Sequence, residues 1–223
     1  MLEYAIIEMI LIKHWRCRLS NMNPIQQTYP ALQSTNKEQT LCFTGHRPDK
    51  LPEGKRLAGL IQTLYYYIDS VLERGYVCFL DGMADGIDYL AAEYLFRKKA
   101  EFPDIRIIGV QPCRNYEDFF RDRQYSMTHL NFMKAHFDAL ICLEGEYHRH
   151  SGRKNDMLFL ARNHFLVDHS SAVIAVCSME RSGSFQTVSY AKQKNLSICR
   201  IEANPQLFYS PKPEQWPVEK VNF

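Results

Sequence analysis

Apolar and polar positions alternate in two distinct ways from about Gln39 onward. Short runs rich in β-branched and apolar residues predict strands at residues 41–43, 76–80, 105–110, 139–143, 172–177 and 196–201. Between them, apolar residues recur at spacings of three and four. This spacing predicts helices at residues 53–74, 87–99, 119–136, 156–169 and 186–194. Repeated strand–helix–strand units imply right-handed crossovers, so the sequence predicts an α/β fold: a three-layer α/β/α sandwich with a mostly parallel sheet.

The chain divides by pattern into three regions, at residues 1–38, 39–203 and 204–223. Residues 1–12 are apolar, but Glu3 and Glu8 interrupt them and the basic residues follow rather than precede. This pattern fits neither a secretory signal nor a bilayer span, so we expect a flexible N-terminal extension, with Met22 as an alternative initiator. Residues 39–203 form the predicted ligand-binding domain. The last region contains four prolines and predicts an irregular C-terminal tail.

Charge and cysteine usage narrow the classes of partner and compartment. Lys and Arg total 27 against 25 for Asp and Glu, a near-balance that weighs against a dedicated nucleic-acid surface. Five of the seven cysteines fall in predicted strands, where cysteine acts as a small buried apolar residue: Cys42, Cys78, Cys142, Cys177 and Cys199. Because no two cysteines have zinc-binding or redox-pair spacing, we expect reduced thiols in the cytoplasm and no metal site.

Candidate chemistry lies in the turns that follow the strands. Ligands of an open parallel sheet bind beyond the carboxyl ends of its strands. Three turns there combine glycine with small polar or basic residues: Thr44-Gly45-His46-Arg47, residues 81–88, and Ser182-Gly183-Ser184. Glycine lets the backbone approach a phosphate, and the N–H groups of a following helix supply donors. One such turn is a weak signal, but three on one edge indicate a phosphate-containing ligand.

Several side chains near these turns have two interpretations that the sequence leaves open. Arg47 is either a bidentate phosphate partner or a solvated arginine before proline. His46 is either an acid–base group or a hydrogen-bonded turn residue. Asp85 and Asp88 have helix-start spacing, which favours N-capping and dipole compensation over ligand contact. Arg162 interrupts an apolar helix, either at its rim or pointing into the ligand cleft.

Four segments carry a family resemblance. They are TGHRP at residues 44–48, GMADGIDYLAAE at 82–93, RN at 162–163 followed by VDHSSAVIAV at 167–176, and SGSFQTVSYA at 182–191. Their order and spacing resemble the YpsA-related branch of the SLOG superfamily, over about residues 41–202. That superfamily has a Rossmann-like fold and includes the cytokinin-activating phosphoribohydrolases and the DNA-processing protein DprA.

The resemblance implies a set of ligand-binding residues. They are Gly45, His46 and Arg47 in the first loop; Gly82, Met83, Gly86 and Asp88 in the second; the polar pair Arg162 and Asn163; and Gly183, Ser184 and Thr187 in a phosphate loop. This chain has Ser182-Gly183-Ser184 where the branch usually has Gly-Gly-Thr. The serine keeps a hydroxyl group near a phosphate, but the missing glycine restricts how closely the backbone can approach.

Three functions follow as hypotheses. The first is recognition of a nucleotide-derived ligand such as ADP-ribose or NAD by a sensor or regulatory module. The second is hydrolysis of a nucleotide. The related hydrolases place a glutamate after the glycine-rich loop, whereas residues 185–190 here contain no carboxylate, so Asp88 or Glu93 would have to substitute. The third is single-stranded DNA binding of the DprA type, for which the candidate patch is Arg114, Arg121, Arg123 and Lys134. We expect no membrane partner, and a homo-oligomer stays open.

Overall fold

The computed structural model describes residues 29–223 except 122, 150, 179–181 and 205–211, and also excepting the side chains of residues 153 and 215. The chain divides into two compact units, Met1–Ser34 and Thr35–Phe223. Within the first unit, the described residues include one short 3₁₀ helix, η1 (Pro30–Leu32). The predictions for the N-terminal extension up to residue 28, including Met22, lie outside the described residues.

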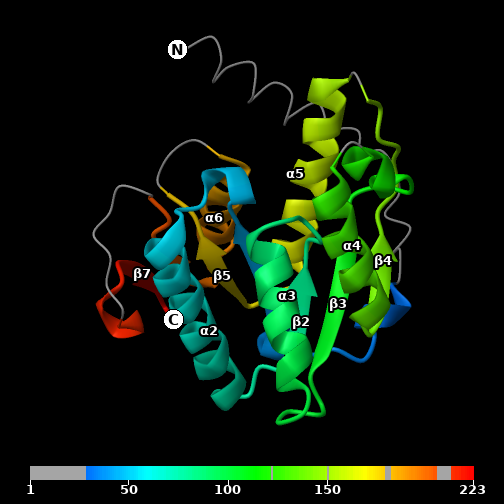
Figure 1. Ribbon diagram of the computed structural model, residues 1–223. Coiled ribbons are helices and arrows are strands. Elements are labelled where there is room, and N and C mark those ends of the chain that lie inside the picture. Colours follow the sequence, from blue (N-terminus) through cyan, green and yellow to red (C-terminus); the bar gives the residue numbers. More distant parts are fainter. Residues whose placement is uncertain (1–28, 122, 150, 179–181, 205–211) are drawn as a thin grey trace. The chain divides into compact units, whose positions relative to one another are not determined.

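Seven strands form one sheet in the order β4-β3-β2-β1-β5-β6-β7 (Figure 1). Their bounds are β1 Thr40–Gly45, β2 Cys78–Asp81, β3 Arg106–Gln111, β4 Ala139–Cys142, β5 Ala172–Val176, β6 Ser197–Ile201 and β7 Val218–Val221. All neighbours pair in parallel except β6 and β7, which are antiparallel. The six predicted strands and the mostly parallel sheet are therefore confirmed.

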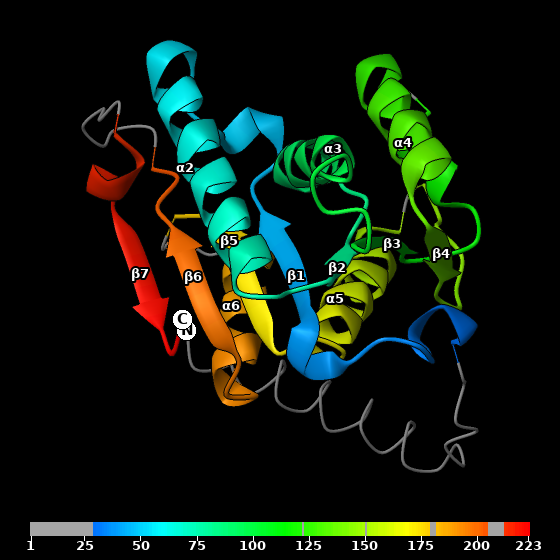
Figure 2. The ribbon, with the colours of Figure 1, turned by 90° about the horizontal axis from the view of Figure 1, so that it is seen from below.

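Helices cover both faces of the sheet, as the view along it shows (Figure 2). On one face lie α2 (Gly54–Glu73), α3 (Ile87–Lys98) and α4 (Gln124–His136), and on the other α5 (Gly152–Asp168) and α6 (Gly183–Gln193). Short 3₁₀ turns η2 (Lys37–Gln39), η3 (Pro48–Lys50) and η5 (Pro213–Gln215) connect these elements. The three-layer α/β/α prediction is confirmed. Among the described helices, none is long and apolar enough to cross a membrane.

The helix predicted at residues 119–136 is divided in two. The chain first forms η4 (Tyr116–Phe120) and begins α4 only at Gln124. Asn115 fixes this break, because its side chain accepts a hydrogen bond from Tyr147 N at 2.7 Å and donates one to Tyr147 O at 3.0 Å. Tyr116 and Phe120 are thereby buried. The break thus depends on a loop 32 residues away, which local spacing does not reveal.

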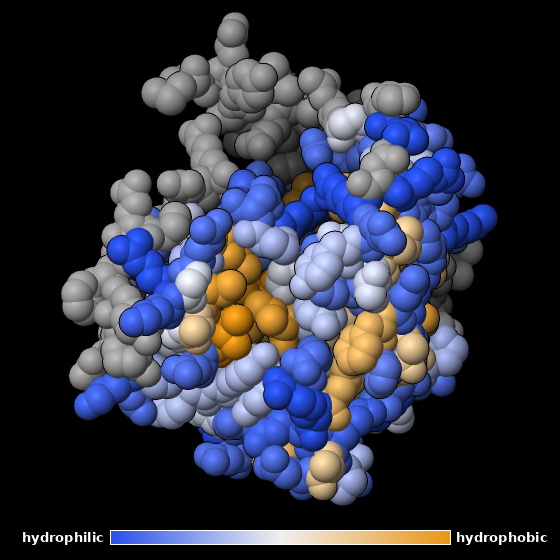
Figure 3. Space-filling model, viewed as in Figure 1, coloured by the Kyte–Doolittle hydropathy of each residue, from blue (hydrophilic) through white to orange (hydrophobic). Residues whose placement is uncertain are grey.

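The packing of α2 follows the predicted apolar spacing. Leu60, Leu64, Ile68 and Val71 are fully buried and belong to one cluster with residues of β1, β2 and β5. Each such side chain contributes roughly 1.5–3 kcal/mol by leaving water. The exposed surface of this face is mostly hydrophilic, with an apolar area between α2 and α3 (Figure 3).

Two expectations differ from the structure. The tail was expected to be irregular, yet Val218–Val221 forms β7 against β6, and the preceding Trp216 is buried in the core. The four prolines that suggested irregularity all precede this strand and do not interrupt it. Cys142 was expected to be buried, but it is exposed because β4 is an edge strand. The other four strand cysteines are buried, and all six described cysteines are free thiols.

Candidate ligand site at the strand ends

The three glycine-containing turns follow β1, β2 and β5, which are neighbours in the sheet. From β1 the chain adds strands toward β4 on one side and then, from β5, on the other. The ends of β1 and β5 therefore form the topological switch point, where open α/β sheets bind ligands. Hydrogen bonds join the first turn to the end of β5 and to the third turn. His46 N donates to Val176 O at 3.0 Å, and the Ser184 hydroxyl donates to Gly45 O at 2.7 Å.

The second turn packs directly on the first. Gly86 has a φ of +90°, and a Cβ atom there would lie 2.5 Å from His46 O. Ile87 N, at the start of α3, donates to the same carbonyl at 3.3 Å. A side chain at position 86 would therefore need a disfavoured backbone conformation and would push the two turns apart.

Arg162, on α5, is hydrogen-bonded to the backbone of the second turn. Its side chain is buried, donates from Nη1 to Gly82 O, and places Nη1 3.8 Å from Asp88 Oδ2. Asp88 Oδ2 also accepts a hydrogen bond from Ala84 N at 3.3 Å. Gly82 lies between these groups, because a Cβ atom there would be 2.1 Å from Arg162 Nη1. Arg162 and Asp88 thus act on the shape of the turn.

Asp81 and Asp88 make this region an unusual buried acid pair. Burial, reinforced by the charge of Asp88, raises the pKa of Asp81 well above its ordinary value. Asp81 Oδ1 accepts a hydrogen bond from Met83 N at 2.6 Å, whereas Oδ2 is buried without a hydrogen-bond partner among the described residues. Burial also raises the pKa of Asp88 to about 6, although Arg162 opposes the shift. Burial therefore favours the protonated form of both carboxyl groups.

Met83 lies at the apex of the same turn in a strained conformation. Its φ is +58° and its side chain is fully buried. The Tyr116 hydroxyl donates to Met83 O at 3.2 Å, so both the backbone N–H and the backbone carbonyl of Met83 are hydrogen-bonded. Positive φ at a residue other than glycine persists only where the surroundings enforce it. The turn is therefore rigid before any ligand arrives.

The third turn leads into α6. The Ser182 hydroxyl caps this helix by accepting a hydrogen bond from Phe185 N at 3.1 Å. The buried Thr187 hydroxyl donates to Gly183 O at 2.8 Å. Among the described residues, no atom lies within 4 Å of a Cβ atom placed at Gly183, so the part of the chain that the structure describes leaves space beside this backbone. Glu180 and Arg181, which precede the turn, lie outside the described residues.

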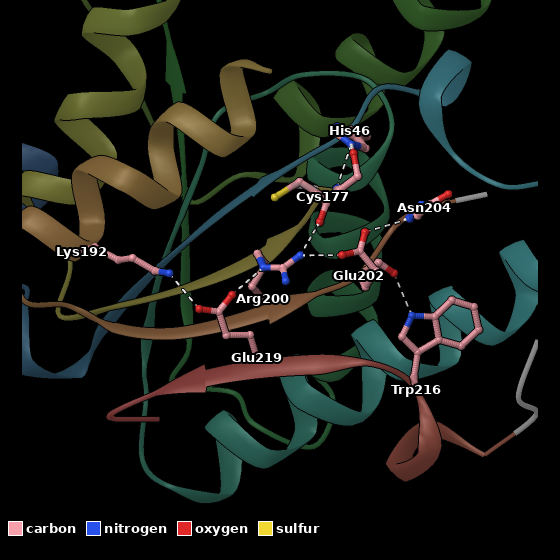
Figure 4. Close-up of polar contacts among 9 residues, drawn as sticks. His46, Cys177, Lys192, Arg200, Glu202, Asn204, Trp216 and Glu219 are labelled. Atoms are coloured by element: carbon pink, nitrogen blue, oxygen red, sulfur yellow. Dashed lines mark hydrogen bonds and ion pairs between the residues drawn. The ribbon is translucent and has the colours of Figure 1, made fainter. Parts of the chain in front are cut away.

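His46 is tied into a polar network that runs to the C-terminal strand (Figure 4). Its Nε2 accepts a hydrogen bond from Ser178 N at 3.1 Å, which assigns the proton to Nδ1. Next to Ser178, Cys177 O accepts a hydrogen bond from Arg200 at 3.1 Å. Arg200 also pairs with Glu202 and Glu219, each at 2.8 Å. The network fixes the end of β5, and His46 is hydrogen-bonded within it. Its role as an acid–base group stays a prediction.

Asp85 is hydrogen-bonded to α4, a contact that no local sequence pattern predicts. Asp85 Oδ1 accepts hydrogen bonds from Gly86 N at 2.9 Å and from His129 Nδ1 at 2.7 Å, and Ser126 Oγ donates to Oδ2. Burial raises the pKa of Asp85, but the hydrogen bonds from Ser126 and His129 outweigh it and leave the pKa below its ordinary value. Neither Asp85 nor Asp88 caps α3, whose N-cap residue is Gly86.

The remaining site residues lie at the same strand ends. Thr44 is buried near the carboxyl end of β1, and Asn163 is half-buried on α5, next to Arg162. Arg47 is half-buried, with its guanidinium carbon 4.6 Å from the centroid of the Phe119 ring and 5.6 Å from that of Phe159. The described residues contain no cluster of His, Cys, Asp and Glu suited to hold a metal ion.

Comparison with known proteins identifies a family and a relative that this chain resembles. Residues 41–203 match the family model YpsA, described as the YspA SLOG family. UPF0398 protein YpsA of Bacillus subtilis (strain 168) is 21% identical over 154 residues, which are 66% of this chain and 79% of that protein.

Two solved structures have a similar fold. DNA processing protein A from Helicobacter pylori, whose structure concerns its single-stranded DNA binding mode, has a TM-score of 0.50 and 20% identity over 77% of this chain and 67% of that one. DprA from Streptococcus pneumoniae has a TM-score of 0.46 and 18% identity over 73% and 50% of the two chains. The family match covers most of the chain, including all three turns, so this chain belongs to the YpsA SLOG family.

Proposed function

We propose that this chain binds a nucleotide or nucleotide-derived ligand, such as ADP-ribose or NAD, and serves as a sensor or regulatory module in the cytoplasm. One observation carries the proposal: three glycine-containing turns, on the neighbouring strands β2, β1 and β5, interlock at the switch point of a parallel sheet.

The turns offer the donors that a phosphate needs. The helix α6 begins at Gly183, and the hydrogen bond from Ser184 to Gly45 O places its first backbone N–H groups and the positive end of its dipole beside the end of β1. Because no described residue lies within 4 Å of a Cβ atom at Gly183, a phosphate oxygen would have room beside this backbone. Arg47 supplies a guanidinium whose hydrogen-bonding groups engage no described residue.

The positions of the two candidate catalytic carboxylates, Glu93 and Asp88, favour ligand recognition over catalytic turnover. Glu93, one candidate catalytic group, pairs with Arg97 at 2.9 Å on α3. Asp88, the other, is buried behind the turn against Ala84 N and Arg162. General acid–base catalysis requires a carboxyl group that reaches the scissile bond. A nucleotide hydrolase is therefore the alternative, to be decided by product analysis.

The basic patch considered for single-stranded DNA is partly neutralised. Arg121 pairs with Asp118, and Lys134 pairs with Glu117. The DprA likeness concerns the fold at 20% identity. DNA binding is therefore an outcome of the test below rather than the leading function.

Calorimetric titration of the purified protein with ADP-ribose, NAD, AMP and a short single-stranded oligonucleotide tests the proposal. Chromatography of each mixture reports any product. We expect nucleotide binding, with affinity weakened at least about tenfold in Arg47→Ala and nearly unchanged in Lys50→Ala, which removes the same charge three residues away. Absence of binding by every nucleotide would refute the proposal. Product formation would favour the hydrolase, and strand binding that weakens steeply with salt would favour DNA.

A further inference from the structure

Two arginines from different elements converge on one aromatic ring near the candidate site. Arg47 follows β1, and Arg123 directly precedes α4. Each guanidinium carbon lies 4.6 Å from the centroid of the Phe119 ring. The two cations are therefore separated by no more than twice that distance. Arg123 was predicted only as part of the candidate DNA patch, and Phe119 was not among the predicted site residues.

Nearby carboxylates do not neutralise this pair. Glu117 is engaged by Lys134, and Asp118 accepts from Arg121 and, at 3.0 Å, from Asn115. Within the described part of the chain, neither guanidinium on Phe119 makes a hydrogen bond or an ion pair with a carboxylate. Two neighbouring positive charges thus lack a counter-charge of their own.

The Phe119 ring that both guanidiniums contact is packed among other aromatic rings. Phe119 makes edge-to-face contacts with Phe120 at 5.0 Å, Phe159 at 5.1 Å and Tyr147 at 5.6 Å between ring centroids. These partners come from η4, α5 and the loop before α5. The helix α5 extends past the carboxyl ends of the strands (Figure 1). Since cations favour the faces of aromatic rings, a ring held by these contacts also positions both guanidiniums.

The environment of Arg47 favours an anion. Burial lowers the pKa of Arg47, and the charges of Arg162 and Arg123 add to this effect, although Tyr116 and Asp88 oppose it. The rings of Phe119 and Phe159 stabilise the half-buried Arg47 cation but accept none of the hydrogen bonds that it has lost to water. An anionic ligand would supply the missing partner, and the second arginine would then bind the same ligand.

We propose that Arg47 and Arg123, seated on Phe119, form a subsite for the diphosphate group of a nucleotide-derived ligand. The inference rests on the proposed function and specifies its ligand class: two adjacent phosphates, as in ADP-ribose, rather than one. The reason is charge matching, because two guanidiniums of one positive charge each face two linked phosphates of one negative charge each. Arg123 binds the ligand, and Phe119 is a positioning residue.

The test is calorimetric titration of the full chain with inorganic pyrophosphate, orthophosphate, ADP-ribose and AMP. Arg123→Ala should weaken pyrophosphate and ADP-ribose binding at least about tenfold, and AMP binding less than about threefold. The matched control is Arg121→Ala, which removes the same charge two residues away but from a group already paired with Asp118. It should change each affinity less than about twofold.

Two variants test the role of the ring, with thermal unfolding as the check on folding. Phe119→Tyr keeps an aromatic face and should bind pyrophosphate nearly as well as the original chain. Phe119→Leu keeps both charges but removes the face, so pyrophosphate affinity should fall about threefold or more while the salt dependence is retained. Equal losses in the two variants would overturn the positioning role.

The outcomes separate this inference from the proposed function. Equal effects of Arg123→Ala and Arg121→Ala would overturn the subsite even where nucleotides bind. Equal losses for AMP and ADP-ribose would overturn the assignment to a diphosphate. Pyrophosphate binding that depends on Arg123, in a chain that binds no nucleotide, would refute the proposed function and retain the subsite.

Discussion

At the scale of residues, the glycines of the site serve different purposes. Gly82 is required by its neighbours, since a Cβ atom would lie 2.1 Å from Arg162 Nη1 and 2.8 Å from Asp88 Oδ2. At Gly183, by contrast, a Cβ atom would lie within 4 Å of none of the residues that the structure describes. The sequence indicated that glycines mark the site, but it could not distinguish a glycine needed for packing from one that leaves room for a ligand.

This difference predicts unequal effects of the same substitution. Gly82→Ala should lower the free energy of unfolding by about 1–3 kcal/mol, because the buried Arg162 must move away from its carbonyl partner. Gly183→Ala should change it by less than about 1 kcal/mol. Urea unfolding followed by circular dichroism measures both. Losses of similar size would show that the packing around Gly82 tolerates a methyl group.

The buried acid pair predicts a pH dependence. The folded protein raises the pKa of Asp81, so it binds this proton more tightly than the unfolded chain does. The contribution of Asp81 to stability is therefore present at low pH and declines as pH rises above the ordinary aspartate value. Asp81→Asn imitates the neutral carboxyl and keeps the acceptor for Met83 N.

In urea unfolding, the stability of Asp81→Asn relative to the original chain should therefore increase by at least about 1 kcal/mol from about pH 5 to pH 8. A constant difference over that range would mean that Asp81 is ionised in the folded protein.

At the scale of elements, the sequence predicted what short-range patterns encode. The β-branched runs and the apolar spacing of α2 suffice because each element carries its own signal. The break between η4 and α4 depends on Asn115 meeting Tyr147, and β7 depends on pairing with β6. The site divides in the same way. Topology brings the turns together, whereas the approaches of Arg162 to Gly82 and of His129 to Asp85 join residues far apart in sequence.

The C-terminal strand should matter for stability more than its length suggests. Trp216, just before β7, is buried and donates from Nε1 to Glu202 O at 2.8 Å. Trp216→Ala should lower the free energy of unfolding by about 3–5 kcal/mol, and Trp216→Phe, which loses the hydrogen bond but keeps a ring, by clearly less. Tyr125→Ala is the control, since Tyr125 is 73% exposed. Equal small losses at both positions would show that the tail detaches without consequence for the sheet.

At the scale of the whole molecule, free thiols are distributed over both halves of the sheet. Cys78 lies on β2, on one side of the switch point, and Cys199 lies on β6, on the other. Burial raises the pKa of both, that of Cys199 to about 12. Such thiols react with alkylating reagents only when the structure opens. Cys142, exposed on the edge strand β4, is accessible in the folded protein.

Pulsed alkylation followed by mass spectrometry should therefore modify Cys142 rapidly, and Cys78 and Cys199 slowly with one common rate. A common rate is expected because β1 and β5 pair over five residues and join the halves into one cooperative sheet. A ligand at the switch point binds only the folded sheet, so ADP-ribose should slow both buried thiols equally and leave Cys142 unchanged. The variant Cys142→Ser identifies the rapid site. Protection of only one half would place the ligand away from the junction of β1 and β5, because a ligand bound to turns from both halves must be released before either half opens.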